Sequence, residues 1–274
     1  MIKQGGKYVI MGLLNTDSIA YAAGSLIESM GGKVTYTVQN ERMKRIFFDR
    51  SQDLTQEQRD AMDIRYCDVT VENEVRNLFN GIDEIDGLLH SIAFANPKTC
   101  LGDNVYTNAF TDIKQAFHIS CVSFSTVAQF AQEHMPKGGS IATLTFSSGV
   151  AYPYYNWMGI NKAALEALVR ALAREYGREH VRVNAVSAGP LKTKAAKSIP
   201  HFAHLARTWR KISPLPWDTV NDKREVANAV LFLLGEYSKK ITGQTIYVDG
   251  GASAIGGELL KHEKPIKSKP AKKR

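Results

Sequence analysis

Short apolar runs alternate with amphipathic stretches along nearly the whole chain, and this alternation restricts the fold more than any other feature. The first run, at 7–12, contains β-branched and aromatic residues and ends in a glycine. A stretch with helical periodicity follows at 18–30, and a second strand-like run lies at 33–38. A β-α-β unit of about thirty residues is what a parallel sheet with crossover helices requires.

The same alternation continues toward the end of the chain. Further strands are predicted at 64–68, 87–91, 140–145, 181–186 and 244–248, with helices at 71–80, 110–133, 159–176 and 223–234. The predicted fold class is α/β, a single Rossmann-like doubly wound parallel sheet with helices on both faces. No linker or repeat interrupts it. We therefore expect one domain over 1–257 and a basic, disordered tail over 258–274.

The formal net charge of +8 is concentrated at one end of the 274-residue chain. The last fourteen residues hold seven Lys or Arg and one Glu, so the body is nearly neutral. A solvated tail is the simpler interpretation, and weak contact with polyanions is the alternative, so nucleic acid is not an expected partner of the domain. The chain has neither a run of about 18 apolar residues nor a signal-peptide pattern, which favours a soluble cytoplasmic protein without membrane contact.

Cysteine and histidine spacing argues against disulfides and metals. Cys67, Cys100 and Cys121 are odd in number and widely spaced, so we expect reduced thiols. The seven histidines show no metal-ligand spacing, and no metal site is expected. The Gly-x-Ser-x-Gly motif of serine hydrolases is absent, which excludes that class.

Candidate binding residues follow the strands, where parallel α/β sheets bind ligands. Gly12 and Ser18-Ile19 belong to the first strand–helix loop, which is not Gly-x-Gly-x-x-Gly. Ser18 is expected to cap the helix and to offer its hydroxyl to a pyrophosphate. Gln39 ends the second strand and suits a free ribose 2′-hydroxyl, whereas the nearby Arg42 leaves room for a 2′-phosphate.

Two later strands end in similar candidates. Asp68, followed by Val69, is placed to accept a hydrogen bond from an adenine amino group. The segment His90-Ser91-Ile92-Ala93-Phe94-Ala95 is placed to run beside a cofactor. Capping or core packing is the alternative role for each residue taken alone.

Tyr155 and Lys162 form the most specific pair in the chain. They are seven residues apart at the head of a helical segment, which is about two turns or roughly 10 Å of rise. Both side chains then project from one face, so a proton-donating phenol and an ammonium share one groove.

These motifs, with Val183-Asn-Ala-Val-Ser-Ala-Gly-Pro-Leu-Lys-Thr193 and Val248-Asp-Gly-Gly251, resemble the short-chain dehydrogenase/reductase superfamily. The Tyr-x6-Lys spacing and Ser187-Ala-Gly-Pro-Leu-Lys-Thr193 are similar to the NADH-dependent enoyl-acyl-carrier-protein reductases of bacterial fatty-acid synthesis. The resemblance covers roughly residues 5–255. It implies reduction of a trans-2-enoyl thioester on acyl carrier protein, with NADH as cofactor and NADPH as the alternative that Arg42 favours.

The resemblance also implies roles for individual residues. Tyr155 would hydrogen-bond the thioester oxygen, and Lys162 would hold the nicotinamide ribose. The cofactor would further contact a segment after the sixth predicted strand, made up of Leu191, Lys192, Thr193, Lys194 and Ala195. The acyl chain would contact Ala95, Phe146, Tyr155, Ile199 and Phe202, with 195–206 as a mobile flap.

One departure from the family pattern concerns Phe146. Many of these reductases have a second Tyr ten residues before the catalytic one, and here Phe146 stands nine before Tyr155. A phenyl ring has no proton to donate, so Phe146 is expected to be a wall for the acyl chain.

Two surfaces are candidates for protein contacts. Lys194, Lys197, Arg207 and Arg210 would attract an acidic carrier protein or simply be solvated. Small residues at 163, 167 and 171, with the way relatives use this helix, indicate a homotetramer, with a purely intradomain helix as the alternative.

Two other functions stay open. A ketone-reducing member of the superfamily is disfavoured because classical members place Tyr four residues before Lys. In an enoyl thioester the hydride adds at C3 while charge develops on the more distant carbonyl oxygen, and we relate the longer spacing to that displacement. A catalytically inactive nucleotide-binding scaffold is supported only by the tail.

Overall fold

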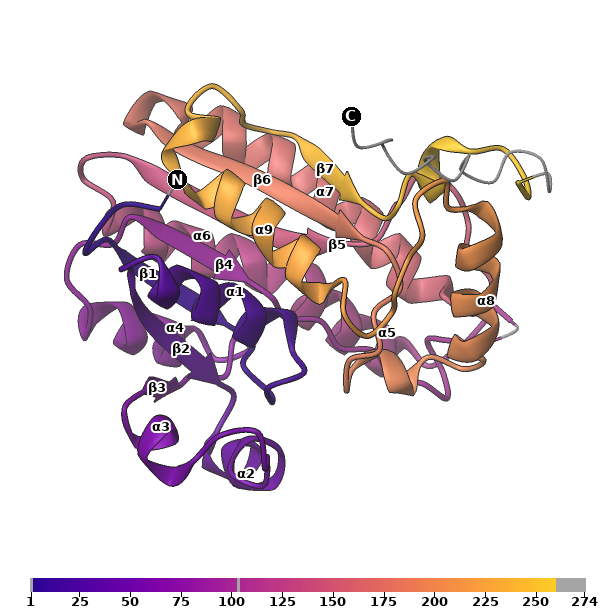
Figure 1. The fold of residues 1–274 in the computed structure, drawn as a ribbon, viewed down its shortest axis with the longest axis horizontal. Coiled ribbons are helices and arrows are strands. Elements are labelled where there is room, and N and C mark those ends of the chain that lie inside the picture. The colour runs from indigo at the N-terminus through magenta and orange to yellow at the C-terminus, as the bar shows by residue number, and fades with distance from the viewer. Residues whose placement is uncertain (1, 103, 260–274) are drawn as a thin grey trace, which may run out of the picture.

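The computed structural model describes residues 2–102 and 104–259. Its centre is a seven-stranded, all-parallel sheet with the strand order β3-β2-β1-β4-β5-β6-β7 (Figure 1). The strands are β1 (Lys7–Met11), β2 (Lys33–Val38), β3 (Asp63–Tyr66), β4 (Gly87–His90), β5 (Gly139–Thr145), β6 (Val181–Ala188) and β7 (Thr245–Val248). The order reverses between β1 and β4, which creates the crevice where such sheets bind ligands. The predicted fold class is confirmed.

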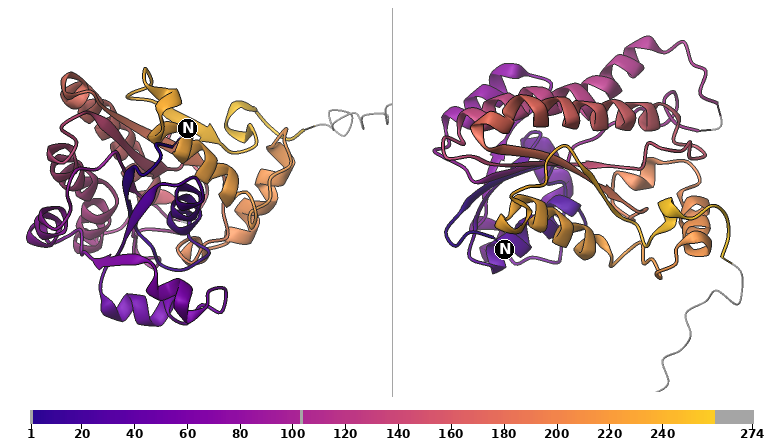
Figure 2. Two further views of the ribbon diagram at one scale, coloured as in Figure 1. Left: turned by 60° about the vertical axis from the view of Figure 1, so that its left-hand side comes forward. Right: turned by 90° about the horizontal axis from the view of Figure 1, so that it is seen from above.

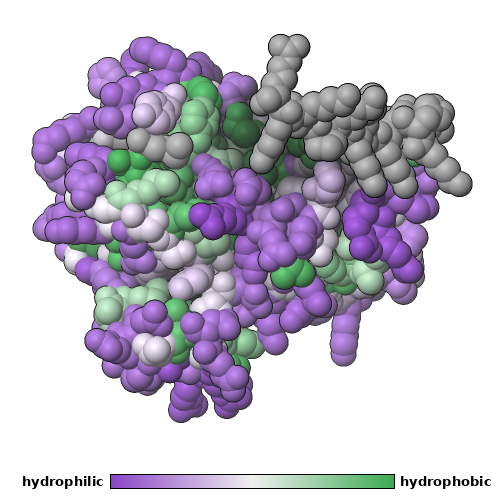
Figure 3. Space-filling view, in the orientation of Figure 1, coloured by the Kyte–Doolittle hydropathy of each residue, from purple (hydrophilic) through white to green (hydrophobic). Residues whose placement is uncertain are grey.

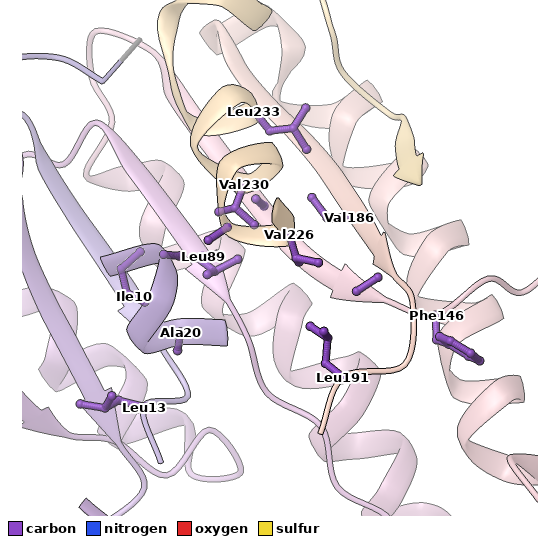
Figure 4. Close-up of a cluster of buried hydrophobic side chains, with 14 of the residues drawn as sticks. Ile10, Leu13, Ala20, Leu89, Phe146, Val186, Leu191, Val226, Val230 and Leu233 are labelled. Carbon is purple, nitrogen blue, oxygen red and sulfur yellow. The ribbon is translucent and has the colours of Figure 1, made fainter. Parts of the chain in front are cut away.

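Helices cover both faces of the sheet (Figure 2). One layer contains α1 (Ile19–Ser29) and α9 (Lys223–Leu234), and the other contains α4 (Glu72–Asn80), α6 (Ser123–Glu133) and α7 (Asn156–Tyr176). Successive side chains of β1 point to opposite faces of the sheet. Ile10 packs in the first core, between the sheet and the layer of α1 and α9, whereas Val9 and Met11 pack in the second core on the other face. Figure 4 shows the first core, where Ile10, Leu89 and Val186 meet Val226 and Val230 of α9.

Polar residues inside β6 find partners at the ends of neighbouring elements. The Arg182 guanidinium donates to the carbonyls of Leu233 and Gly235 at 2.7 and 2.9 Å. The Asn184 amide donates to the Ile241 carbonyl at 2.8 Å and accepts from the Gln244 backbone N–H at 3.0 Å. A buried strand therefore tolerates these residues because their hydrogen bonds are satisfied.

Three parts of the secondary structure differ from the prediction. The helix predicted at 110–133 is divided into α5 (Phe110–Phe117), a π-helical turn η2 (His118–Val122) and α6. The segment after β2 forms three short helices, α2 (Glu41–Met43), the π-helical η1 (Lys44–Phe48) and α3 (Gln56–Asp60). The expected flap at 195–206 forms a 3-10 turn, η4 (Ala196–Ser198), and the first part of the regular helix α8 (Phe202–Ile212). The first two differences concern short or interrupted elements, which lack the long periodicity that a sequence pattern needs, whereas α8 is amphipathic and was missed.

The surface is mostly hydrophilic on the face that Figure 3 presents. Within the described residues, no helix is long and apolar enough to cross a membrane. The predicted tail lies almost entirely outside the described residues, which end at Leu259.

Candidate active site

The loop after β1 has the geometry of a phosphate-binding turn. Gly12 has a φ of +91°, and a Cβ placed on it would lie 2.2 Å from the Ser91 carbonyl oxygen. Ser18 caps α1, because its hydroxyl oxygen accepts from the Tyr21 backbone N–H at 3.1 Å. The same hydroxyl donates to the Asn15 carbonyl at 2.7 Å, so its hydrogen is already used within the loop.

Two features of this loop suit a dinucleotide. The partial positive charge at the N-terminus of α1 favours an anion. The absence of a side chain at Gly12 lets the chain pass close to Ser91. The side-chain oxygen of Asn15 is buried without a hydrogen-bond partner, which leaves an acceptor for a bound group. The residues present therefore fit a dinucleotide bound at the crevice that the strand order creates.

Gln39 and Asp68 lie side by side beyond β2 and β3. The Gln39 side-chain amide donates to the Asp68 carboxylate at 2.8 Å, and Thr70 donates to it from both its backbone and its hydroxyl. Burial raises the pKa of Asp68, but the hydrogen bonds from Thr70 and Gln39 outweigh it, and the pKa lies below its usual value. Val69 is buried beside them, and Arg42 is exposed on α2.

The chain after β4 follows the crevice toward η2. The Ser91 backbone N–H donates to the Met11 carbonyl at 3.1 Å. The Ser120 hydroxyl accepts from the Phe94 N–H and donates to the Phe94 carbonyl, both at 2.9 Å. Ile92 and Ala93 lie between these anchors, and the following Ala95 is buried.

A pocket of about 140 Å³ opens beyond the carboxyl ends of β5 and β6. Residues from the first loop, the β5–α7 loop, the segment after β6 and α8 line it together. They are Ile19, Thr145, Phe146, Tyr155, Ala188, Gly189, Pro190, Leu191, Thr193, Ala196, Ile199, Phe202 and Leu205. Figure 4 shows Phe146 and Leu191 beyond the strand ends. Ala95 is the one expected substrate contact outside this lining.

Aromatic side chains form one wall of the pocket. The Phe146 ring packs 5.0 Å from Tyr155, 4.5 Å from Tyr152 and 5.5 Å from Trp209, measured between centroids. Tyr155 is 9% exposed, and burial raises the pKa of its phenol, which therefore stays protonated. Trp209 of α8, which the sequence did not single out, joins this wall to the flap.

Lys162 is buried one and a half turns into α7. Its ammonium donates to the Leu144 carbonyl at 2.8 Å and is 5% exposed. Burial lowers the pKa of Lys162 to about 8, with opposing effects from Cys121 and Glu166. An ammonium has three donors, so two remain for a ligand.

The backbone on either side of Tyr155 is strained. Tyr154 has a φ of +66° and Asn156 a φ of +25°, and residues other than glycine rarely adopt such positive values. Contacts from Gly102 and Val105 hold this conformation. The Gly102 N–H donates to the Tyr154 carbonyl at 3.1 Å, and the Asn156 amide donates to the Gly102 carbonyl at 2.7 Å. Trp157 adds a bond from its indole to the Val105 carbonyl at 2.9 Å.

The segment after β6 crosses from the pocket toward η1. Leu191 is buried, and the Lys192 N–H donates to the Thr219 carbonyl at 2.7 Å. The Thr193 hydroxyl accepts from the Ala196 N–H at 3.2 Å, which fixes the turn through Ala195. The Lys194 ammonium lies 5.1 Å above the Phe47 ring.

All three cysteines are free and buried. In the described part of the chain, no cluster of His, Cys, Asp or Glu could hold a metal ion.

A family model described as enoyl-(acyl carrier protein) reductase matches residues 12–253. The chain belongs to the enoyl-(acyl carrier protein) reductase family. It is 37% identical over 262 residues to the Rickettsia prowazekii enoyl-acyl-carrier-protein reductase named for NADH, covering 94% of this chain and 97% of that one. It is also 37% identical to the Staphylococcus aureus (strain MRSA252) reductase named for NADPH, over 90% of this chain and 96% of that one.

A solved structure agrees with this assignment. The crystal structure of the enoyl-acyl-carrier-protein reductase from Anaplasma phagocytophilum in complex with NAD matches with a TM-score of 0.83 and 31% identity. The match covers 94% of this chain and 95% of that chain. The predicted resemblance is confirmed, and members of this family use NADH or NADPH.

Proposed function

We propose that this reductase converts trans-2-enoyl-acyl-carrier-protein to acyl-acyl-carrier-protein, with NADH as the preferred cofactor. The observation that carries the proposal is the pocket, in which the Tyr155 phenol shares one lining with Ile19, Leu191 and Thr193 of the cofactor segments. Its membership of the enoyl-(acyl carrier protein) reductase family supports the same substrate class.

The cofactor would be held along the crevice at the carboxyl ends of the strands. Gly12, Ser18 and Ile19 would face the pyrophosphate and nicotinamide, and Gln39, Asp68 and Val69 the adenosine. Ser91, Ile92 and Ala93 would run beside it, and Lys162 would bind the nicotinamide ribose with its two remaining donors. The segment formed by Leu191, Lys192, Thr193, Lys194 and Ala195 would close over it. When bound, the dihydronicotinamide supplies the hydride that adds at C3 of the enoyl thioester.

Tyr155 would act on the opposite end of the reacting group. Its phenol is kept protonated by burial, so it donates a hydrogen bond to the thioester oxygen. Negative charge appears on that oxygen in the transition state, and a donor aimed there lowers the barrier. Phe146, Ile199, Phe202 and Ala95 would contact the acyl chain, and protonation of the enolate at C2 completes the reduction.

Two thioesters and one variant test this proposal. NADH absorbance should fall with a trans-2-enoyl thioester and stay constant with a 3-ketoacyl thioester, which separates enoyl from ketone reduction. Tyr155→Phe should reduce the enoyl rate by about 10- to 1000-fold, the scale of one transition-state donor. A full-rate Tyr155→Phe enzyme, or faster turnover of the ketone, would reject it.

The carrier protein would dock beside the flap. Lys194, Lys197, Arg207 and Arg210 border the pocket-lining residues of this region and suit the acidic surface of a carrier protein. Replacing Arg207 and Arg210 with Ala should raise KM for the carrier-protein substrate while KM for a short coenzyme A thioester stays constant.

We also propose a homotetramer. On α7, Ala163, Ala167 and Ala171 are exposed in one row with Ile160, and Phe117 and Val122 are exposed on the neighbouring helices. Ala167→Glu should dissociate the assembly in light scattering at constant monomer fold.

The remaining proposals concern organisation and location. We assign catalysis to the domain over 1–257, so deleting 258–274 should leave turnover unchanged. The buried free cysteines favour a reducing cytoplasm, which fractionation of cells would test.

A further inference from the structure

A buried carboxylate lies one helical turn after Lys162 on α7. The Glu166 side chain belongs to a residue only 7% exposed, a position that strongly disfavours an unpaired charge. Two hydroxyls satisfy it. Thr145 donates to one oxygen at 2.8 Å and Ser148 to the other at 2.5 Å. Both oxygens therefore act as acceptors, as in an ionised carboxylate.

These two hydroxyls bracket Phe146. Thr145 is the last residue of β5, and Ser148 is two residues beyond Phe146, so one carboxylate holds the chain on both sides of Phe146. The Phe146 ring packs against Tyr155 at 5.0 Å between centroids. Glu166 itself is not part of the pocket lining, so it acts on the pocket through its neighbours.

The same carboxylate is also the negatively charged group near Lys162. Three other titratable groups face the ammonium or lie at the head of its helix, namely Cys121 of η2, His90 of β4 and Tyr155. Burial raises the pKa of Cys121 and of Tyr155 and lowers the pKa of His90 to about 3, so all three are neutral near pH 7. Cys121 and Glu166 both oppose the effect of burial on the pKa of Lys162. The Cys121 thiol is neutral near pH 7, so the Glu166 carboxylate, one turn further along the same face of α7, is left to supply a negative charge.

We propose that Glu166 is a positioning residue for the reduction, which fixes Phe146 against Tyr155 with its two oxygens and keeps Lys162 an ammonium with its charge. This inference rests on the roles proposed above for Tyr155 and Lys162. It joins the acyl wall and the catalytic lysine through one side chain. The two effects are separable by experiment, because one depends on charge and the other on hydroxyl donors.

The effect of the Glu166 charge on Lys162 is tested with Glu166→Gln, which keeps the shape of the side chain and one acceptor oxygen. Without a neighbouring anion the ammonium is less favoured, so the alkaline limb of the kcat/KM profile should move down by about one pH unit. Glu175→Gln is the matched control, because Glu175 is exposed on the same helix, and its profile should coincide with that of the wild type. A limb at the wild-type position in Glu166→Gln would overturn the charge role.

The two hydrogen bonds on either side of Phe146, called the bracket, are tested with Thr145→Val and Ser148→Ala, which keep the carboxylate. KM for the enoyl thioester should rise by about tenfold in the double variant while the alkaline limb stays in place, since one or two hydrogen bonds are lost. Thr145→Ser restores the hydroxyl and should restore KM. An unchanged KM in the double variant would overturn the bracket.

Thermal melting and Tyr155→Phe complete the design. If Glu166→Gln fails to fold, the two hydroxyl variants still decide the bracket, and Glu166→Asp, which keeps the charge on a shorter side chain, decides the charge through its pH profile. Tyr155→Phe reports separately on the proposed function. If Tyr155→Phe is slow but Glu166→Gln has the pH profile of the wild type, the charge role of Glu166 is rejected and the proposed function stands. If Tyr155→Phe has the full rate, the proposed catalytic role of Tyr155 is rejected.

Discussion

The ring of Phe146 meets the ring of Tyr155 nearly edge-on, with centroids 5.0 Å apart and planes inclined by 66°. Such a contact orients the phenol without adding a second proton donor. The acyl wall and the reacting hydroxyl are therefore coupled through one aromatic pair.

Removing this ring should affect both stability and substrate binding. Phe146 is buried, so Phe146→Ala should lower the free energy of unfolding by about 3–5 kcal/mol, the usual cost of such a cavity. KM for the enoyl thioester should rise while NADH affinity stays constant. Denaturant unfolding and steady-state kinetics measure the two effects. Equal losses in NADH and thioester binding would contradict the acyl-wall assignment.

Activity should fall as the pH rises through about 8, because Lys162 loses its proton there. Its contribution to stability has the opposite sign. Between about 8 and the ordinary value of 10.5 the unfolded chain holds a proton that the folded chain lacks, so this contribution increases with pH. Lys162→Met should remove that increase in unfolding experiments. A pH-independent kcat/KM between 7 and about 10 would contradict the depressed pKa.

Gly12→Ala should abolish tight cofactor binding. The φ of +91° costs a non-glycine residue about 1–2 kcal/mol, and the new methyl group would also clash with the Ser91 carbonyl. Gly5→Ala is the matched control, because Gly5 has a φ of +67° with no atom within 4 Å of the added carbon. We expect Gly5→Ala to lose stability alone, and Gly12→Ala to lose both stability and NADH affinity in calorimetry.

Cofactor selectivity should depend on Arg42. An arginine contact with a phosphate contributes about 1.5–3 kcal/mol, so Arg42→Ala should raise the NADH preference in kcat/KM by about tenfold or more. Arg45→Ala removes an exposed charge from the next helical turn and serves as the control. Equal losses with both cofactors would exclude a role for Arg42 in selectivity.

Periodicity was sufficient to predict the sheet and the helices that cover it. Long, uniformly patterned elements such as α9 agree with the prediction over 223–234. It did not predict η2, whose π-helical turn divides a continuous amphipathic stretch, or η1, which spans only Lys44–Phe48. Backbone geometry of that kind depends on packing, which a residue pattern does not record.

For the candidate site, too, the sequence predicted some residues and missed those that depend on packing. Motif spacing located Tyr155, and strand ends located the candidates of the first loop, because strand ends meet at one edge of the sheet. The family resemblance indicated Phe146, Leu191, Thr193, Ile199 and Phe202, which line the pocket. It missed Trp209 and Glu166, whose roles depend on contacts with residues far away in the chain. The signal for Glu166 was present, since an acidic residue four after Lys162 must share its buried face.

The strained backbone around Tyr155 has a consequence for protein engineering. A conformation of this kind persists only where its surroundings enforce it, and here the enforcing contacts come from Gly102 and Val105. The Tyr-x6-Lys motif is therefore not sufficient when it is transferred to another protein. In a scaffold without equivalent contacts, the backbone at Tyr154 would relax and the phenol would take a different orientation.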